Sequence, residues 1–171
     1  MQNLYVDTKY MMQKSIRAMM ELLAKVENQL EDKQHTQEIL MDSRLAPDMF
    51  SFVRQVQIMS DNAKGAMARL SGKEIPLFSD HEQTLEELVD RLQKTLDFIQ
   101  TISDEDLRGA DDRQMVLPYF EGKFQTAEDY VRDYAIPNFY FHFVTAYAIL
   151  RMKGFDIGKA DFIGGLNLKD L

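Results

Sequence analysis

Apolar side chains recur at alternating spacings of three and four residues in four long stretches of the chain. These stretches are residues 5–30, 47–70, 79–102 and 126–153. Because an α-helix has 3.6 residues per turn, this spacing puts the apolar side chains on one face of a helix. Four such helices predict an all-α, antiparallel four-helix bundle. No low-complexity linker divides residues 1–171, so we expect a single domain.

Residues with capping roles mark the expected ends of these helices. Pro47 fits the first turn of the second helix, because an N–H group there would have no helical partner. Gly72 is a suitable stop for the same helix. Ser79 and Glu82 have the spacing of a capping box, which predicts that the third helix begins there. Thr126 is expected to cap the fourth helix.

The segments between these helices carry weaker patterns. The connector over residues 31–46 is expected to hold one short helix at residues 37–41. Residues 115–124 contain proline and a Glu-Gly pair, which indicate either a short β-hairpin or another ordered excursion. Pro137 has no N–H to donate within the fourth helix, so a kink or a local polar substitute is expected. Four apolar residues are expected to dock the C-terminal tail on the bundle: Phe155, Ile157, Phe162 and Ile163.

Composition narrows the classes of partner. The chain has 28 acidic and 20 basic residues and a formal charge of −8, so it should repel nucleic acid. It has no cysteine, which excludes disulfides and thiolate metal sites. The longest uncharged stretch, residues 134–150, is slightly too short and too polar for a good membrane span. We therefore expect a cytoplasmic protein that binds neither nucleic acid nor membrane.

Candidate chemistry centres on His142 in the middle of the most apolar helix. Asn138 lies one helical turn before it, on the same face, at a spacing that can hold one metal ion. On the second helix, Asp61 is an isolated acid one turn after Gln57, with Asn62 beside it. Asp61 can act as a ligand, a base or a partner of His142, or it can pair with a surface lysine or arginine.

Each of these residues also has a purely structural interpretation. His142 can be a core histidine bonded to a neighbouring polar group. Asn138 can satisfy backbone groups freed near Pro137. Tyr140 and Tyr147 lie on the same helix as His142. Either can donate to a pocket ligand, although a buried tyrosine usually finds a local partner.

Several longer motifs resemble a known family across nearly the whole chain. They are Arg44-Leu45-Ala46-Pro47-Asp48-Met49-Phe50, Arg54-Gln55-Val56-Gln57, Asp61-Asn62-Ala63-Lys64-Gly65, Pro137-Asn138-Phe139-Tyr140-Phe141-His142 and Thr145-Ala146-Tyr147-Ala148-Ile149-Leu150-Arg151. Gly158-Lys159 with Asp161-Phe162 completes the set. The sequence resembles a bacterial family of uncharacterised proteins similar to the DinB/YfiT-like metalloenzyme superfamily. The resemblance implies a four-helix bundle that is often a homodimer.

The resemblance also implies a metal site made of three histidines, one on the second helix and two on the fourth. Only His142 matches by residue type. Asn138 takes the place of the other fourth-helix histidine, and the second-helix position falls near Gln57 or Asp61, of which we prefer Asp61. The set His142, Asp61 and Asn138 is thus the candidate site for a divalent metal, zinc or nickel. Gln57, Asn62, Tyr140 and Tyr147 are the candidate pocket residues.

Two functions follow as hypotheses. The first is a DinB-like bundle with a degenerate metal site that binds a small molecule or acts by association, as a homodimer. The alternative is a metal-dependent transferase or hydrolase that uses His142 and Asp61, in which the metal lowers the pKa of a bound water or substrate thiol.

Overall fold

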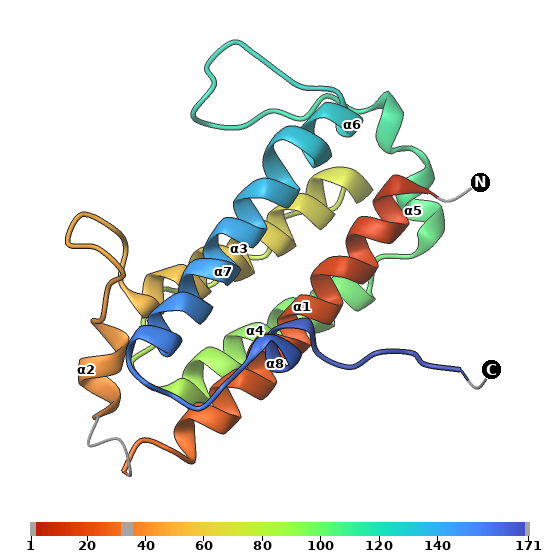
Figure 1. Cartoon of the computed structure of the whole chain (residues 1–171). Helices are drawn as coiled ribbons and strands as arrows, with labels where there is room; N and C mark the ends of the chain where they lie inside the picture. The colour runs from red at the N-terminus through yellow and green to blue at the C-terminus, as the bar shows by residue number, and fades with distance from the viewer. Residues whose placement is uncertain (1–2, 32–35, 170–171) are drawn as a thin grey trace.

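The computed structural model describes residues 3–31 and 36–169, which leaves part of the predicted connector and the last two residues of the tail outside the described residues. Four long helices pack side by side (Figure 1). They are α1 (Leu4–Glu27), α3 (Phe52–Ser71), α4 (Leu85–Gln100) and α7 (Ile136–Met152). The predicted all-α four-helix bundle is confirmed.

A long crossover segment determines which helices of the bundle run parallel and which run antiparallel. Residues 72–84 leave the end of α3 and return along the bundle, so α4 starts beside the start of α3 (Figure 1). The two helices therefore run in parallel: Ser60 bonds Thr95 at 2.8 Å, and Lys73 Nζ donates to the carbonyl of Thr101 at 2.5 Å. The pairs α1 with α4 and α3 with α7 are antiparallel, as expected of the bundle.

The start of α3 differs from the prediction. Pro47 lies in a turn closed by the N–H of Met49, which donates to the carbonyl of Ala46 at 3.0 Å. The helix begins at Phe52, whose N–H donates to the carbonyl of Ser43 at 2.8 Å. Proline is also favoured at the second position of a β-turn, so Pro47 is accommodated here without a helix. Gly72 ends α3 as predicted, with φ of 73°.

The third helix also begins later than predicted. Thr84 and Glu87 form the capping box of α4, with the N–H of Glu87 donating to the Thr84 hydroxyl at 3.2 Å. Ser79 and Glu82 have the right spacing but lie in the crossover. The carboxylate of Glu82 binds Arg91 rather than the backbone of a helix start. The buried guanidinium of Arg91 is a stronger partner for this carboxylate than the backbone N–H groups of a helix start.

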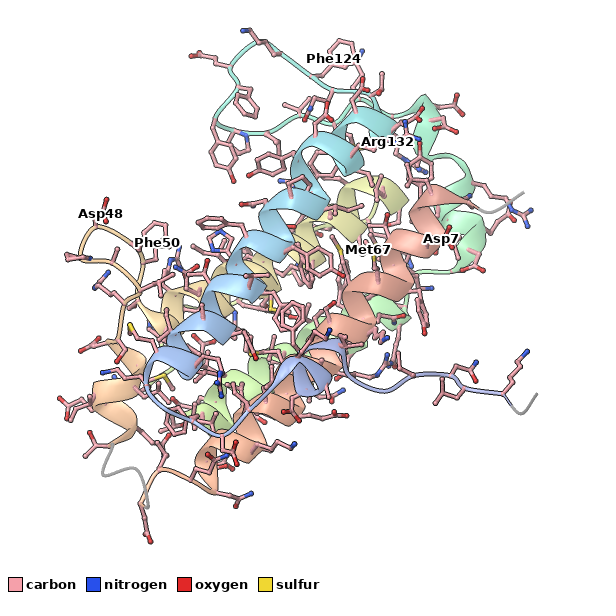
Figure 2. All side chains as sticks on the ribbon, viewed as in Figure 1. Asp7, Asp48, Phe50, Met67, Phe124 and Arg132 are labelled. Carbon is pink, nitrogen blue, oxygen red and sulfur yellow. The ribbon has the colours of Figure 1, made fainter. Side chains whose placement is uncertain are left out.

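The excursion before α7 contains α5 (Asp104–Arg108) and a 3₁₀ turn at Ala110–Asp112. Of the two alternatives for residues 115–124, the ordered excursion is the one observed. One antiparallel bridge, Met115 with Gln125, closes it, and no longer strand forms among the described residues. Figure 2 shows Phe124 near the outer edge of the loop, whereas Met67 lies inside the bundle.

The break expected at Pro137 takes the form of a π-helical turn. Thr126 caps α6 (Ala127–Asp129) as predicted, accepting the N–H of Asp129 at 3.1 Å. A π-helical segment, Tyr130–Ala135, then leads directly into α7, where Pro137 is in the first turn. A π-turn shifts the hydrogen-bond register, which accommodates the missing proline donor.

The predicted short helix in the connector is present as α2 (Gln37–Met41). The tail forms α8 (Lys159–Ile163) against α1. Phe155 and Ile157 are buried, and the ring of Phe162 stacks on Phe143 with centroids 4.3 Å apart. Ile163 is the exception among the predicted docking residues, because 40% of it remains exposed. No helix in residues 3–31 and 36–169 is both long and apolar enough to cross a membrane.

Candidate ligand-binding cavity

A cavity of about 590 Å³ lies along the groove between α3 and α7. The crossover and the excursion complete its walls. Its lining is Phe50, Arg54, Ile58, Asp61, Asn62, Lys64, Gly65, Arg69, Ile75, Pro76, Leu77, Phe78, Leu117, Tyr119, Tyr130, Tyr134, Asn138 and His142. This volume is in the range of small-molecule sites, which combine apolar walls with a few polar groups.

The structure brings four of the predicted site residues to this one cavity. They are Asp61, Asn62, Asn138 and His142. The antiparallel packing of α3 on α7 causes this, since it sets the middle of one helix against the first half of the other.

The other three predicted pocket residues lie elsewhere. Gln57 Nε2 donates to the carboxylate of Glu82 at 2.8 Å. The hydroxyl of Tyr140 bonds that of Ser15 at 3.2 Å, toward α1. The ring of Tyr147 packs edge-on against Phe162 of the tail, with centroids 5.3 Å apart. These residues were placed in the pocket on helix position alone, and each instead packs against a neighbouring element.

His142 is held in one orientation by Gln55, a residue that the sequence did not single out. Its Nδ1 lies 2.7 Å from Oε1 of Gln55, whose Nε2 donates to the carbonyl of Phe50 at 3.1 Å. Because the amide oxygen faces the ring, Nδ1 carries the hydrogen and Nε2 keeps its lone pair. Burial, assisted by the charge of Arg54, lowers the pKa of His142 to about 4. The imidazole is therefore neutral near pH 7 and can accept a hydrogen bond.

Asp61 is not a partner of His142. Its Oδ1 accepts from Arg91 Nη2 at 2.6 Å and pairs with Lys64 Nζ at 2.9 Å. Lys64 also lies over the ring of Phe78, 3.9 Å from the centroid. Among the roles considered for Asp61, the structure therefore supports an ion pair with basic side chains rather than a bond to His142.

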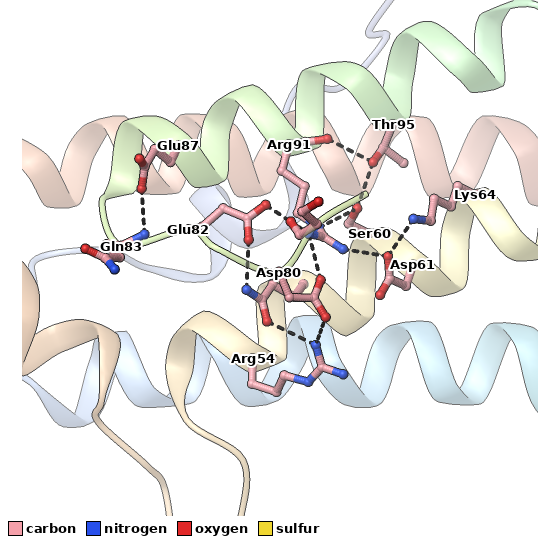
Figure 3. Close-up of polar contacts among 12 residues, drawn as sticks. Arg54, Ser60, Asp61, Lys64, Asp80, Glu82, Gln83, Glu87, Arg91 and Thr95 are labelled. Carbon is pink, nitrogen blue, oxygen red and sulfur yellow. Dashed lines mark hydrogen bonds and ion pairs between the residues drawn. The ribbon is translucent and has the colours of Figure 1, made fainter. Parts of the chain in front are cut away.

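Arg91 of α4 is the centre of a charged network that ties the crossover to the bundle (Figure 3). Only 2% of Arg91 is exposed. Besides Asp61, its guanidinium binds Asp80 and Glu82 of the crossover, each at 2.9 Å, and Ser60 at 3.2 Å. Burial opposes the charge of Arg91, but the bonds to Glu82 and Asp61 raise its pKa. The network fixes the wall of the cavity that the crossover forms.

Asn62 has an unusual environment for an amide. The residue is 9% exposed and lines the cavity. Its Oδ1 is buried and accepts no hydrogen bond from any described residue. Buried polar atoms are nearly always paired, because an unpaired one costs free energy. Asn62 is a residue of the cavity wall, so a rotation of its amide would present this oxygen to a bound molecule that can donate.

Comparison with known proteins gives consistent results. The family model of DUF1993, a domain of unknown function, matches residues 4–163. The chain belongs to the DUF1993 family. A crystal structure of a DinB family member from Shewanella denitrificans is 37% identical, covers 98% of this chain and 96% of that chain, and superposes with a TM-score of 0.93. Among curated proteins there is no significant match.

These findings confirm that this DUF1993 chain is DinB-like. They say nothing about a metal, and whether one can bind depends on the chemistry of the candidate residues. In the part of the chain that the structure describes, no three His, Cys, Asp or Glu side chains converge on a metal position. The carboxylate of Asp61 is already neutralised by Arg91 and Lys64, and these cations would repel a metal ion. Asn138 offers an amide, which zinc and nickel bind poorly. The residues do not fit a divalent metal.

Arg91 and Gln55, which support the cavity of this DUF1993 protein from behind its wall, were missed for different reasons. Arg91 follows Leu88 by three residues, so it lies on the buried side of its helix. A charge at such a position was the available signal, since arginine is rarely buried without partners. Gln55 gave no signal, because a glutamine on a helix is usually solvated.

Proposed function

We propose that this DUF1993 protein binds a small organic molecule in the cavity between α3 and α7, without a metal ion. The observation that carries the proposal is the unpaired Oδ1 of Asn62, because this residue lines a cavity of about 590 Å³ and a rotation of its amide would turn the oxygen toward that space. The neutral ring of His142 supplies a second acceptor at Nε2. Two acceptors in one cavity favour a molecule with hydrogen-bond donors.

The walls support a molecule that is partly apolar. Five aromatic rings line the cavity, three of them tyrosines. Aromatic surfaces bury a large area at small entropic cost, so the tyrosines provide affinity while the acceptors provide orientation.

The first experiment compares fragments in ligand-observed NMR with wild type, Asn62→Leu and the matched control Asn167→Leu. Asn167 is exposed in the tail. We expect fragments with N–H or O–H donors to bind wild type and Asn167→Leu, and to lose about tenfold or more in affinity to Asn62→Leu, because one hydrogen bond is lost. Equal binding to all three proteins, or no binding by any fragment, would contradict the proposal.

The alternative, a metal-dependent transferase or hydrolase, is tested in the same preparation. Asp61 would have to exchange two cationic partners for a metal ion. We expect isothermal titration with zinc and nickel to show no stoichiometric site that is lost in His142→Ala. Micromolar binding of one ion per chain, abolished by that substitution, would instead support the enzyme.

We further propose that the chain forms a homodimer through the outer side of α7. Phe141, Val144 and Met152 are each about half exposed, although the helix is apolar. Their spacing puts them on one stripe of the helix. An apolar stripe that faces solvent is typical of a surface that a partner covers. In a two-fold symmetric dimer, the same stripe of the second copy covers it.

A further inference from the structure

One end of the cavity is built around Arg69 of α3. An added Cβ on Gly65, one turn earlier, would lie 2.7 Å from Nη1 of Arg69. The guanidinium thus lies against the helix backbone, in space from which a Cβ at residue 65 would displace it. A glycine in the middle of a helix lowers its stability relative to alanine, so this one needs another reason to be there. Room for Arg69 is that reason.

Arg69 is accompanied by two phenols. Its guanidinium lies near Tyr130, which is 1% exposed and lines the same cavity. Burial raises the pKa of Tyr130 despite the nearby Arg69, so the phenol keeps its proton. The O–H of this protonated phenol can donate to a bound molecule. Burial and a hydrogen bond with Tyr119 raise the pKa of Tyr134 to about 12, which keeps that phenol protonated as well.

The charges in the cavity wall do not cancel. Arg54 pairs with Asp80 at 2.5 Å, and Lys64 pairs with Asp61 at 2.9 Å. Arg69 has no carboxylate within ion-pair distance among the described residues. The wall therefore carries one uncompensated positive charge beside protonated phenols, which is an arrangement that attracts a single negative charge.

The positions of Arg69 and Asn62 on α3 set the length of a molecule that can contact both. The two residues are seven apart on α3, which is two turns along one face and about 10 Å of helix. A molecule that meets both has a carboxylate at one end and a hydrogen-bond donor about 10 Å away. A guanidinium binds a planar carboxylate through two parallel bonds. A phosphate dianion would find one cation too few.

We propose that the cavity selects an elongated monocarboxylate, whose carboxylate binds Arg69 and Tyr130 and whose far end donates to Asn62. This inference rests on the proposed function, since it names the chemical class that the cavity takes.

The test uses 4-(4-aminophenyl)butyrate and its homologues with one methylene fewer or more. The aniline is the donor, and the carboxylate lies at a matching distance. Each acid is compared with its primary amide and with the corresponding phosphate monoester by isothermal titration. The proteins are wild type, Arg69→Gln and the control Arg108→Gln, whose arginine is exposed and paired with Glu105. We expect acids to bind wild type about tenfold or more tighter than amides, and to lose that advantage in Arg69→Gln only.

Gly65→Ala gives an independent variant that should fold. Its new Cβ displaces the guanidinium of Arg69, so the acids should lose affinity while the amides do not. The control is Gly165→Ala, because an added Cβ there meets nothing within 4 Å.

The outcomes separate this inference from the proposed function. Amides or phosphate monoesters that bind as well as the acids, with no effect of Arg69→Gln, would overturn the monocarboxylate and leave binding at Asn62 in place. Asn62→Leu is titrated with the same acids. Acids whose affinity depends on Arg69 but not on Asn62 would support the carboxylate site at Arg69 and contradict the role of Asn62. Binding of no probe to wild type would count against both.

Discussion

At the scale of single residues, the cavity keeps polar atoms that folding alone does not need. Asn62 places an unpaired amide oxygen in the wall, and Gly65 weakens the middle of α3 to admit a guanidinium. Residues that cost stability where a ligand would bind are typical of functional sites.

Asn62→Leu should stabilise the fold. The substitution removes the unpaired Oδ1 and adds apolar surface at a position that is 9% exposed. We expect the free energy of unfolding to rise by about 1 kcal/mol. Urea denaturation monitored by circular dichroism measures it, with Asn167→Leu as control. A loss of stability would mean that the oxygen has a partner in the folded protein.

His142 should make stability depend on pH in the acid range. Its pKa in the folded protein is about 4, against an ordinary value of 6.5. As pH falls below 6.5 the unfolded chain takes up the proton first, so stability is full above 6.5 and is lost between 6.5 and 4. The loss amounts to about 3 kcal/mol, from 1.4 kcal/mol per pKa unit.

Denaturation at pH 7 and pH 4.5 checks this value. His142→Gln, which does not titrate, should lose clearly less stability over the same interval. The carboxylates titrate in both proteins, so the difference between them isolates the imidazole. Equal losses would place His142 in contact with solvent.

At the scale of elements, the crossover over residues 72–84 positions the site more than any single helix does. It carries Phe78 to the cavity wall and Asp80 and Glu82 to Arg91. The charged network holds this irregular segment, which has no ladder or helix of its own among the described residues.

Arg91→Met should destabilise the protein strongly. It removes a guanidinium that is 2% exposed and leaves three carboxylates close together without their common partner. We expect a loss of about 3 kcal/mol in the free energy of unfolding, with faster hydrogen exchange in the crossover. Arg108→Met, at an exposed pair, should change stability by no more than about 0.5 kcal/mol. Similar effects of the two substitutions would show that the network does not hold the crossover.

At the scale of the whole molecule, the proposed homodimer depends on the exposed apolar stripe of α7. Sedimentation velocity at several concentrations should give a dimer for wild type and a monomer for Val144→Glu, because a charge in the middle of the stripe would be buried without a partner. Tyr10→Glu, at an exposed residue of α1, is the control and should remain dimeric. A monomeric wild type, or a dimeric Val144→Glu, would place the stripe outside any interface.

Much of this architecture was predictable from local patterns. The four helices, the short helix at Gln37–Met41 and the cap at Thr126 all depend on neighbours in sequence. The starts of α3 and α4 were wrong, because Pro47 and Glu82 carry signals that a turn or an ion pair satisfies equally well. A local sequence pattern is compatible with several structures, and contacts with residues distant in the sequence determine which one forms.

The sequence by itself determined the four long helices and which of their faces are buried, because the period of apolar residues depends only on helix geometry. Only the tertiary structure decided that α3 and α4 run in parallel, that Asp61 serves Arg91, and that Arg69 shares a cavity with Asn62 and His142. Periodicity carries no record of helix direction or of contact partners. Those depend on the path of the chain, and here the crossover sets that path.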